Sequence, residues 1–197
     1  MPISADKPQL WKADTRASVD QFNKWFMTFA PKAYREARSN TVVSVEEGLA
    51  LSTDLRTITA ELIKEHPAIL PALRMSTCPP LARDRLTGLA DTSKNVIGTL
   101  ERGKLPPRLA PESLDGHLRR IADVLSTMLD TDIFPWLEEK RRPTKAERYR
   151  SSTIVADRLC GAVADPIVRN AQEKRQLALI EAYLVERGYR LQRRGEA

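Results

Sequence analysis

The stretch Pro111-Glu-Ser-Leu-Asp-Gly-His-Leu-Arg-Arg-Ile-Ala-Asp-Val-Leu-Ser-Thr-Met-Leu129 decides the fold class of this chain. Its apolar side chains recur at three- and four-residue intervals: Leu114, Leu118, Ile121, Leu125 and Met128. That spacing places them on one face of an α-helix, where they can be buried together. Pro111 fits the first helical turn, where its missing N–H is not needed. We therefore predict a helix over about 111–129.

The same kind of pattern extends in both directions from this helix. Four further helix starts carry capping signals: Thr59 and Ser93 as single caps, and Ser44 with Glu47 and Thr144 with Glu147 as capping boxes. Pro31 should kink or restart a helix over 13–37, because proline has no N–H to donate to the preceding turn. For the same reason Asp165-Pro166 should begin a separate last helix, which Gly188 ends.

No convincing alternation of apolar and polar residues predicts a strand, and only Tyr189-Arg-Leu has the composition to begin one. We therefore predict a mostly α fold, a multi-helix globular domain. Trp11, Trp25 and Trp136 are interpreted as core or interface aromatics, because two of them neighbour other apolar residues at helical spacing.

Composition limits the class of protein. The 32 Lys and Arg residues outnumber the 26 Asp and Glu residues, and the formal net charge is +6. A cationic surface favours an anionic partner. Cys78 and Cys160 are too few for a disulfide scaffold, which favours the cytoplasm. We see no apolar run of the length that a signal peptide or a membrane span needs, and expect no membrane partner.

Residues for metal or nucleotide chemistry are sparse. His66 and His117 have no cysteine or histidine at ligand spacing, so a zinc site is not expected. Neither a P-loop nor a dinucleotide-binding glycine pattern is present. One acid-x-Lys triplet, Glu138-Glu139-Lys140, has the form found in metal-dependent nucleases. A chain of this composition contains such a triplet by chance, and this one lies at an expected helix end rather than on a strand.

Basic residues are concentrated between positions 140 and 158, a segment that contains seven basic and only two acidic residues. The seven are Lys140, Arg141, Arg142, Lys145, Arg148, Arg150 and Arg158. Arg141, Lys145 and Arg148 recur at helical spacing. We expect them opposite an inward stripe that includes Tyr149 and Ala156. An arginine-rich outer face of this kind can lie along a phosphate backbone or enter a groove. On charge alone, a solvated helix face beside a basic turn is the alternative interpretation, and charge does not favour DNA contact over it.

A second group of cations contains the further candidates Arg83, Arg85 and Lys94. Acidic neighbours dilute this group. Asp84, between the two arginines, also allows simple ion pairing on a helix surface. These residues are therefore secondary candidates for a nucleic-acid contact.

Three blocks of sequence resemble the XamI-type restriction endonuclease family. The longest is Asp157-Arg-Leu-Cys-Gly-Ala-Val-Ala-Asp-Pro-Ile-Val-Arg-Asn-Ala-Gln-Glu173. The others are Leu73-Arg-Met-Ser-Thr-Cys-Pro-Pro-Leu-Ala-Arg-Asp-Arg-Leu86 and the opening Asp6-Lys-Pro-Gln-Leu-Trp-Lys-Ala-Asp14, with the following Trp25-Phe-Met-Thr-Phe-Ala-Pro31. The resemblance implies a type II enzyme that binds a short duplex DNA sequence and cuts both strands with Mg²⁺. It also implies a longer protein, in which a mixed sheet carries the catalytic acids.

Under this resemblance, residues 1–142 form a helical domain of the DNA-recognition type. Residues 143–197 form a basic helix pair that leads into the nuclease core, and the helix over 165–187 resembles the first helix of that core. The family's catalytic triplet has no counterpart here, so we expect the chain to bind DNA, to lack the catalytic core and its sheet, and to be inactive and metal-free alone. Glu173 is the one acid associated with the metal site, and a solvent-facing glutamate is the alternative.

Three hypotheses follow for the partner of the chain. It binds double-stranded DNA as part of a restriction endonuclease, together with the missing C-terminal nuclease part or with a second copy as a homodimer. Alternatively, it is a non-enzymatic helical interaction protein whose basic face meets an acidic protein. In a third hypothesis, a neighbouring reading frame supplies the nuclease core, and cleavage occurs in trans.

Overall fold

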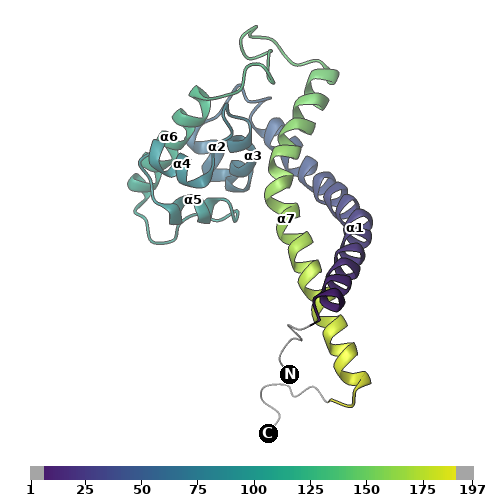
Figure 1. Ribbon diagram of the computed structural model, residues 1–197. Coiled ribbons are helices and arrows are strands. Elements are labelled where there is room, and N and C mark those ends of the chain that lie inside the picture. Colours follow the sequence, from purple (N-terminus) through teal and green to yellow (C-terminus); the bar gives the residue numbers. More distant parts are fainter. Residues whose placement is uncertain (1–6, 190–197) are drawn as a thin grey trace. The chain divides into compact units, whose positions relative to one another are not determined.

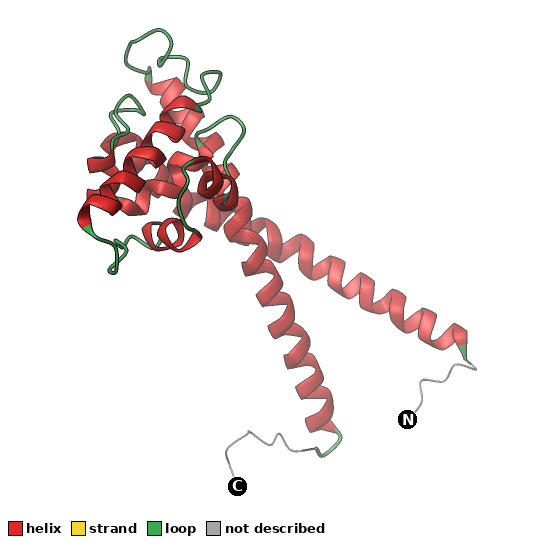
Figure 2. Ribbon diagram, turned by 90° about the vertical axis from the view of Figure 1, so that its left-hand side faces the viewer, coloured by secondary structure: helices red, strands yellow, loops and turns green. Residues whose placement is uncertain are grey.

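The computed structural model of the protein describes residues 7–189, except for the side chains of residues 162 and 163. All regular elements in this range are helices joined by loops, as Figure 2 shows. One isolated antiparallel bridge joins Thr77 to Leu129. The prediction of a mostly α fold is confirmed. The expected strand start at Tyr189-Arg-Leu falls largely outside the described residues.

The chain divides into two units. The central unit is Ala37–Ala162, and the terminal unit consists of the described residues 7–36 and 163–189. The helices, labelled in Figure 1, are α1 (Pro8–Leu51), α2 (Ala60–Glu65), the 3-10 helix η1 (Pro67–Ile69), α3 (Leu70–Met75), α4 (Arg83–Leu89), α5 (Lys94–Leu100), α6 (Pro111–Thr127) and α7 (Lys145–Glu186). Only α1 and α7 contribute residues to both units.

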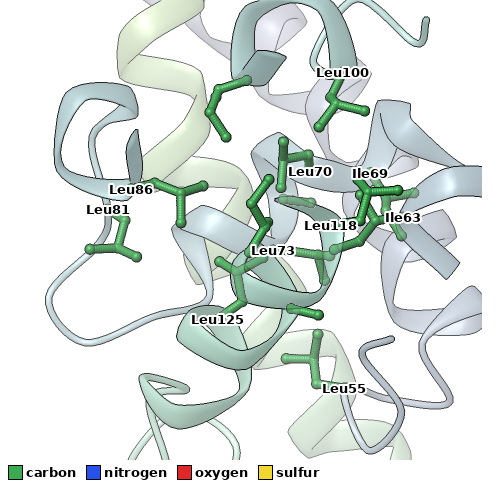
Figure 3. Packing of buried hydrophobic residues seen from close by; sticks show 14 of the residues in the cluster. Leu55, Ile63, Ile69, Leu70, Leu73, Leu81, Leu86, Leu100, Leu118 and Leu125 are labelled. Atoms are coloured by element: carbon green, nitrogen blue, oxygen red, sulfur yellow. The ribbon is translucent and has the colours of Figure 1, made fainter. Parts of the chain in front are cut away.

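The core of the central unit is built on the apolar face of α6. Its buried residues are Leu114, Leu118, Ile121, Ala122 and Leu125. This face packs against α2, and Figure 3 shows Leu118 and Leu125 near Leu73 of α3 and Ile63 of α2. Full burial of each leucine contributes about 1.5–3 kcal/mol. The predicted helix is confirmed, and it ends at Thr127, two residues before the expected end.

The helix caps that the sequence predicts at three places are present. The Thr59 hydroxyl accepts a hydrogen bond from the Leu62 N–H at 3.1 Å, and the Ser93 hydroxyl accepts one from the Val96 N–H at 3.3 Å. At the start of α7, the Glu147 N–H donates to the Thr144 hydroxyl at 3.2 Å, and the Thr144 N–H donates to Glu147 Oε2 at 2.7 Å. This reciprocal pair is a complete capping box.

The prediction that a new helix begins at Pro31 or at Ser44 is wrong, and the alternative of a kink at Pro31 stays a prediction. Helix α1 runs from Pro8 to Leu51 through Pro31 and through the capping-box signal at Ser44. A buried stripe, formed by Ala37, Thr41, Val45 and Leu49, continues across Ser44 at four-residue spacing. Because this packing holds the backbone in the helix, the Ser44 side chain has no free helix start to cap. Pro31 is exposed, so water can reach the carbonyl that its missing N–H leaves without a helical donor.

The prediction of two helices after position 143 is also wrong. Helix α7 is continuous from Lys145 to Glu186, with Pro166 inside it. Its buried residues Val155, Ala156, Cys160 and Ala164 extend to within two residues of that proline. An N-cap residue needs a non-helical backbone at the start of a helix, whereas Asp165 lies inside a helix that began twenty residues earlier. The predicted end at Gly188 is confirmed, because a turn with Gly188 at φ +83° follows the helix.

In the terminal unit, aromatic side chains of α1 gather near α7. Trp25 and Phe29 stack with ring centroids 5.1 Å apart, and Phe22 lies 5.8 Å from Trp25. The guanidinium of Arg175, on α7, lies over the Trp25 ring at 5.8 Å. Trp25 is thus an interface aromatic between these two helix segments, while Trp11 is 45% exposed. Trp136, in the central unit, is fully buried, as expected of a core residue.

Candidate functional site

The basic segment 140–158 begins four residues after Trp136, which is buried together with Phe134. Their rings meet edge to face at 5.4 Å, and Trp136 Nε1 donates to the Asp54 carbonyl at 2.8 Å. The chain then leaves the core, turns at Lys140, whose φ is +50°, and enters α7 at Lys145. Residues 140–144 therefore form an exposed turn between a fixed aromatic anchor and a capped helix.

Four of the predicted cations in this segment are exposed: Lys140, Arg142, Lys145 and Arg150. Their side chains make neither a hydrogen bond nor an ion pair with any residue in the described range 7–189. Their charge is thus not neutralised by the fold in that part of the chain. We call these four residues the open cations.

Arg141 is held by two carboxylates. Its Nη1 and Nη2 donate to Glu147 at 2.8 and 2.6 Å, and its Nε contacts Glu139. Hydrogen bonding from Arg141, with the Thr144 N–H adding to it, lowers the pKa of Glu147 to about 2. Hydrogen bonds to Glu147 and to Glu139 raise the pKa of Arg141 above its ordinary value. The positive charge of Arg141 is therefore neutralised by Glu139 and Glu147.

Arg148 is half-buried, and the prediction is wrong for Arg148 and Tyr149, whereas Ala156 of the predicted inward stripe is buried as expected. The Arg148 guanidinium pairs with Glu46 at 3.2 Å and with Asp54 at 3.0 Å, both near the C-terminal end of α1. Ser151 and Ser152 on the same side are buried, whereas Tyr149 is 74% exposed. The carboxylates of Glu46, in α1, and of Asp54, in the turn after it, pair with Arg148.

The side chain of Arg158 is also bound by other residues of the central unit. Its Nη1 donates to the carbonyls of Met75 and Thr77 at 3.0 and 3.3 Å, and its Nη2 pairs with Asp130 at 3.0 Å. Asp130 is buried, and its N–H donates to the Ser76 carbonyl at 3.0 Å. Arg158 therefore ties α7 to the segment after α3 and to the segment after α6.

The second group of predicted cations lies on α4 and at the start of α5. Arg83 pairs with Glu101, whose side chain is 3% exposed and which also binds the buried Arg74 at 2.6 Å. Lys94 pairs with Asp84 at 2.9 Å, with both side chains 70% exposed. Arg85 is exposed beside an open depression of about 430 Å³ along α4. Arg83 and Lys94 thus carry counter-ions, and Arg85 makes no ion pair with the residues described.

Comparison with known proteins identifies the family. Residues 53–197 match the family described as XamI restriction endonuclease. The chain belongs to the XamI restriction endonuclease family. It is 51% identical over 187 residues to the type II restriction enzyme SalI of Streptomyces albus G, in an alignment that covers 95% of this chain and 59% of SalI. The chain thus spans about three-fifths of the length of that relative. No solved structure matches it.

The described residues of this XamI-family chain do not form a magnesium site. A nuclease metal ion needs carboxylates gathered around it. Within residues 7–189, no group of three or more His, Cys, Asp or Glu side chains lies close enough together to hold a metal ion. Glu173 is exposed on α7 in the terminal unit, and Glu139 of the acid-x-Lys triplet binds Arg141. In the same range, no helix is long and apolar enough to cross a membrane.

Sequence reasoning missed the acidic residues that determine which basic side chains of this XamI-family chain are neutralised. Glu46, Asp54, Asp130 and Glu101 each bind an arginine from a distant part of the sequence. Such pairs have no signal in local spacing. The one local sign was the Ser151-Ser152 pair, since small side chains one turn from Arg148 are typical of a closely packed helix face.

Proposed function

We propose that this chain is the DNA-binding helical part of a type II restriction endonuclease, and that it meets duplex DNA with the start of α7. One observation carries the proposal: the four open cations, Lys140, Arg142, Lys145 and Arg150, lie within eleven consecutive positions without a counter-ion among the residues described. Cations that neutralise DNA phosphates release condensed counter-ions, and this release drives binding. The family of the chain, and its similarity to the restriction enzyme SalI, support duplex DNA as the polyanion.

The remaining basic residues of the segment take a different part in this proposal. Arg141 and Arg148 fix the turn and the rotation of α7 through Glu147, Glu46 and Asp54. They therefore act on DNA indirectly, by holding the open cations in place. Of the second group, Arg85 is the candidate for a direct contact, whereas Arg83 and Lys94 would first have to leave their carboxylate partners.

Cleavage belongs, in this proposal, to a longer enzyme that carries the Mg²⁺-binding core. The chain covers 59% of the length of SalI, and a C-terminal nuclease part or a second copy would complete the enzyme. Residues 1–142 would then serve recognition, and residues 143–197 would connect recognition to cleavage through α7. We expect the chain alone to bind a duplex and to leave it uncut when Mg²⁺ is added.

The test is a salt titration of binding to a labelled duplex. The logarithm of the association constant should fall linearly with the logarithm of salt concentration. Replacing Arg142, Lys145 and Arg150 by alanine should reduce that slope by about 3, or about 1 for each phosphate that the variant no longer neutralises. A slope unchanged by the triple replacement, or no binding by the natural chain, would refute the proposal.

A matched control separates a specific surface from general positive charge. Lys104, Arg108 and Arg119 are exposed in the central unit, and their replacement by alanine removes the same charge. This control variant should keep the natural slope to within about 1. Equal losses of affinity in the two variants would show a diffuse attraction. Tight binding to an acidic protein without a response to DNA would instead support the interaction-protein hypothesis.

A further inference from the structure

We infer that Tyr149 contacts the duplex with its ring and supplies a part of the binding free energy that does not depend on salt. This inference rests on the proposed function, because it assigns a second kind of contact to the same surface. It concerns a residue that the sequence pattern had assigned to the core.

The rotation of α7 about its own axis is fixed where Tyr149 lies. On one side, Arg148 is bound to Glu46 and Asp54, and Val155 is fully buried about two turns later. Ser152 is also buried, with its hydroxyl donating to the Tyr149 carbonyl at 3.0 Å. Tyr149 lies in the second turn of α7, close to the exposed turn that precedes the helix, and its side chain is 74% exposed although Ser152, about one turn later, is buried.

Open cations surround Tyr149 on this outer face. Lys145 lies one turn before it on the same side of the helix, and Arg150 follows it directly. Arg142 precedes the helix in the adjoining turn. A ring flanked by unpaired cations suits a surface that alternates negative phosphates with apolar deoxyribose, which is the chemistry of a nucleic-acid backbone. An acidic peptide would match the cations but offers no regular apolar group between its charges.

A second exposed tyrosine on the same helix shows the contrast. Tyr183 is 55% exposed, but the Arg187 guanidinium covers its ring at 3.4 Å from the centroid. Among the described residues, neither a cation nor another ring lies on Tyr149. The face of Tyr149 is thus open to a ligand, whereas that of Tyr183 is occupied by a neighbour one turn away.

The two kinds of contact differ in how they respond to salt. Phosphate contacts weaken as salt rises, because the released counter-ions return to a more concentrated solution. Packing of an aromatic ring on a sugar or a base releases no ions. Removal of the Tyr149 ring should therefore lower the affinity by the same factor at every salt concentration, without changing the slope.

The experiment compares Tyr149→Ala, Tyr149→Phe and the control Tyr183→Ala with the natural chain in the salt titration. Tyr149→Ala should bind about tenfold more weakly, with an unchanged slope, as expected when one ring no longer packs against the duplex. Tyr149→Phe should stay within about twofold of the natural chain, because the ring remains. Tyr183→Ala should bind as the natural chain does. Thermal melts check that each variant folds, which we expect because both tyrosines are exposed.

The outcomes separate the two proposals. If the natural chain binds DNA with a steep salt dependence but Tyr149→Ala binds equally well, the inference fails and the proposed function stands. A changed slope in Tyr149→Ala, or equal losses of affinity in Tyr149→Ala and Tyr149→Phe, also overturns the inference, since the ring would not be the source of affinity. No binding by the natural chain removes both.

Discussion

Arg141 and Glu147 form a two-point contact, with Nη1 and Nη2 of the arginine 2.8 and 2.6 Å from the two carboxylate oxygens. Glu147 also accepts the Thr144 N–H, so the ion pair and the helix cap share one carboxylate. The turn before α7 is therefore held by the Arg141–Glu147 ion pair together with the helix cap. Arg142, the next residue, has its side chain exposed in that same turn. Two adjacent arginines thus have different surroundings and should differ in their effect on binding.

Arg142→Ala should change the salt dependence of duplex binding more than Arg141→Ala. Removal of an open cation should lower the slope by about 0.9, the value for one phosphate contact, whereas removal of the paired Arg141 should leave it nearly unchanged. A salt titration of each single variant measures this difference. Equal slopes in the two variants would mean that Arg141 leaves Glu147 when DNA binds.

Glu147 should contribute to stability above pH 4.5 and lose that contribution in acid. Its pKa is lowered from 4.5 to about 2, chiefly by Arg141, so the folded state holds the carboxylate more strongly than the unfolded state does. The melting temperature of Glu147→Gln should lie below that of the natural chain near pH 6. This difference should shrink as the pH falls from 4.5 towards 2. Glu138→Gln, at an exposed neighbour, is the control, and it should not reproduce the lower melting temperature of Glu147→Gln near pH 6.

Arg74→Ala should strongly destabilise the central unit. Arg74 and Glu101 are 9% and 3% exposed, and removing the arginine deprives a buried carboxylate of its buried partner. Breaking a buried pair from one side costs about 3 kcal/mol. Arg83→Ala removes a 60% exposed partner of the same carboxylate and should cost less than about 1 kcal/mol. Urea unfolding measures both changes, and equal losses of stability would contradict this ranking.

Thr53→Gly should stabilise the protein. Thr53, Asp54 and Leu55 all have positive φ, with Thr53 at 53°, a region that a β-branched residue rarely adopts. Relief of this strain is worth about 1–2 kcal/mol, and the greater freedom of glycine in the unfolded chain removes part of it. A net gain of about 0.5–1 kcal/mol is expected in urea unfolding. Thr53→Ala keeps the Cβ and should gain nothing, so an equal gain in that variant would exclude strain as the cause.

Local signals in the sequence predicted local structure well. The caps at Thr59 and Ser93 and the box at Thr144 depend on contacts within three residues, and all of them are present. The α6 stripe succeeded for a related reason, since the helical period alone selects its buried face. In each case the interaction that decides the structure lies inside the segment that carries the signal.

Predictions failed where distant residues decide the outcome. Helices α1 and α7 continue through Pro31 and Pro166, and the spacing of neighbouring residues does not show this. Tyr149 was expected inside because its spacing to Ala156 fits a stripe. Ala156 is buried as expected, but Tyr149 is exposed, and Arg148 is half-buried because Glu46 and Asp54, about a hundred residues earlier, supply its counter-charges. The candidate site followed the same rule: its location was predictable, but which of its cations are neutralised was not.

The contacts of Arg158 have a consequence for how the chain matures during synthesis. Its guanidinium binds carbonyls that were translated about eighty residues earlier, at Met75 and Thr77. Until α7 has left the ribosome, those acceptors and the Asp130 carboxylate lack this donor, so the central unit cannot close in strict order from its N-terminus. A nascent chain arrested before position 158 should therefore remain sensitive to protease, and one arrested well beyond it should become resistant.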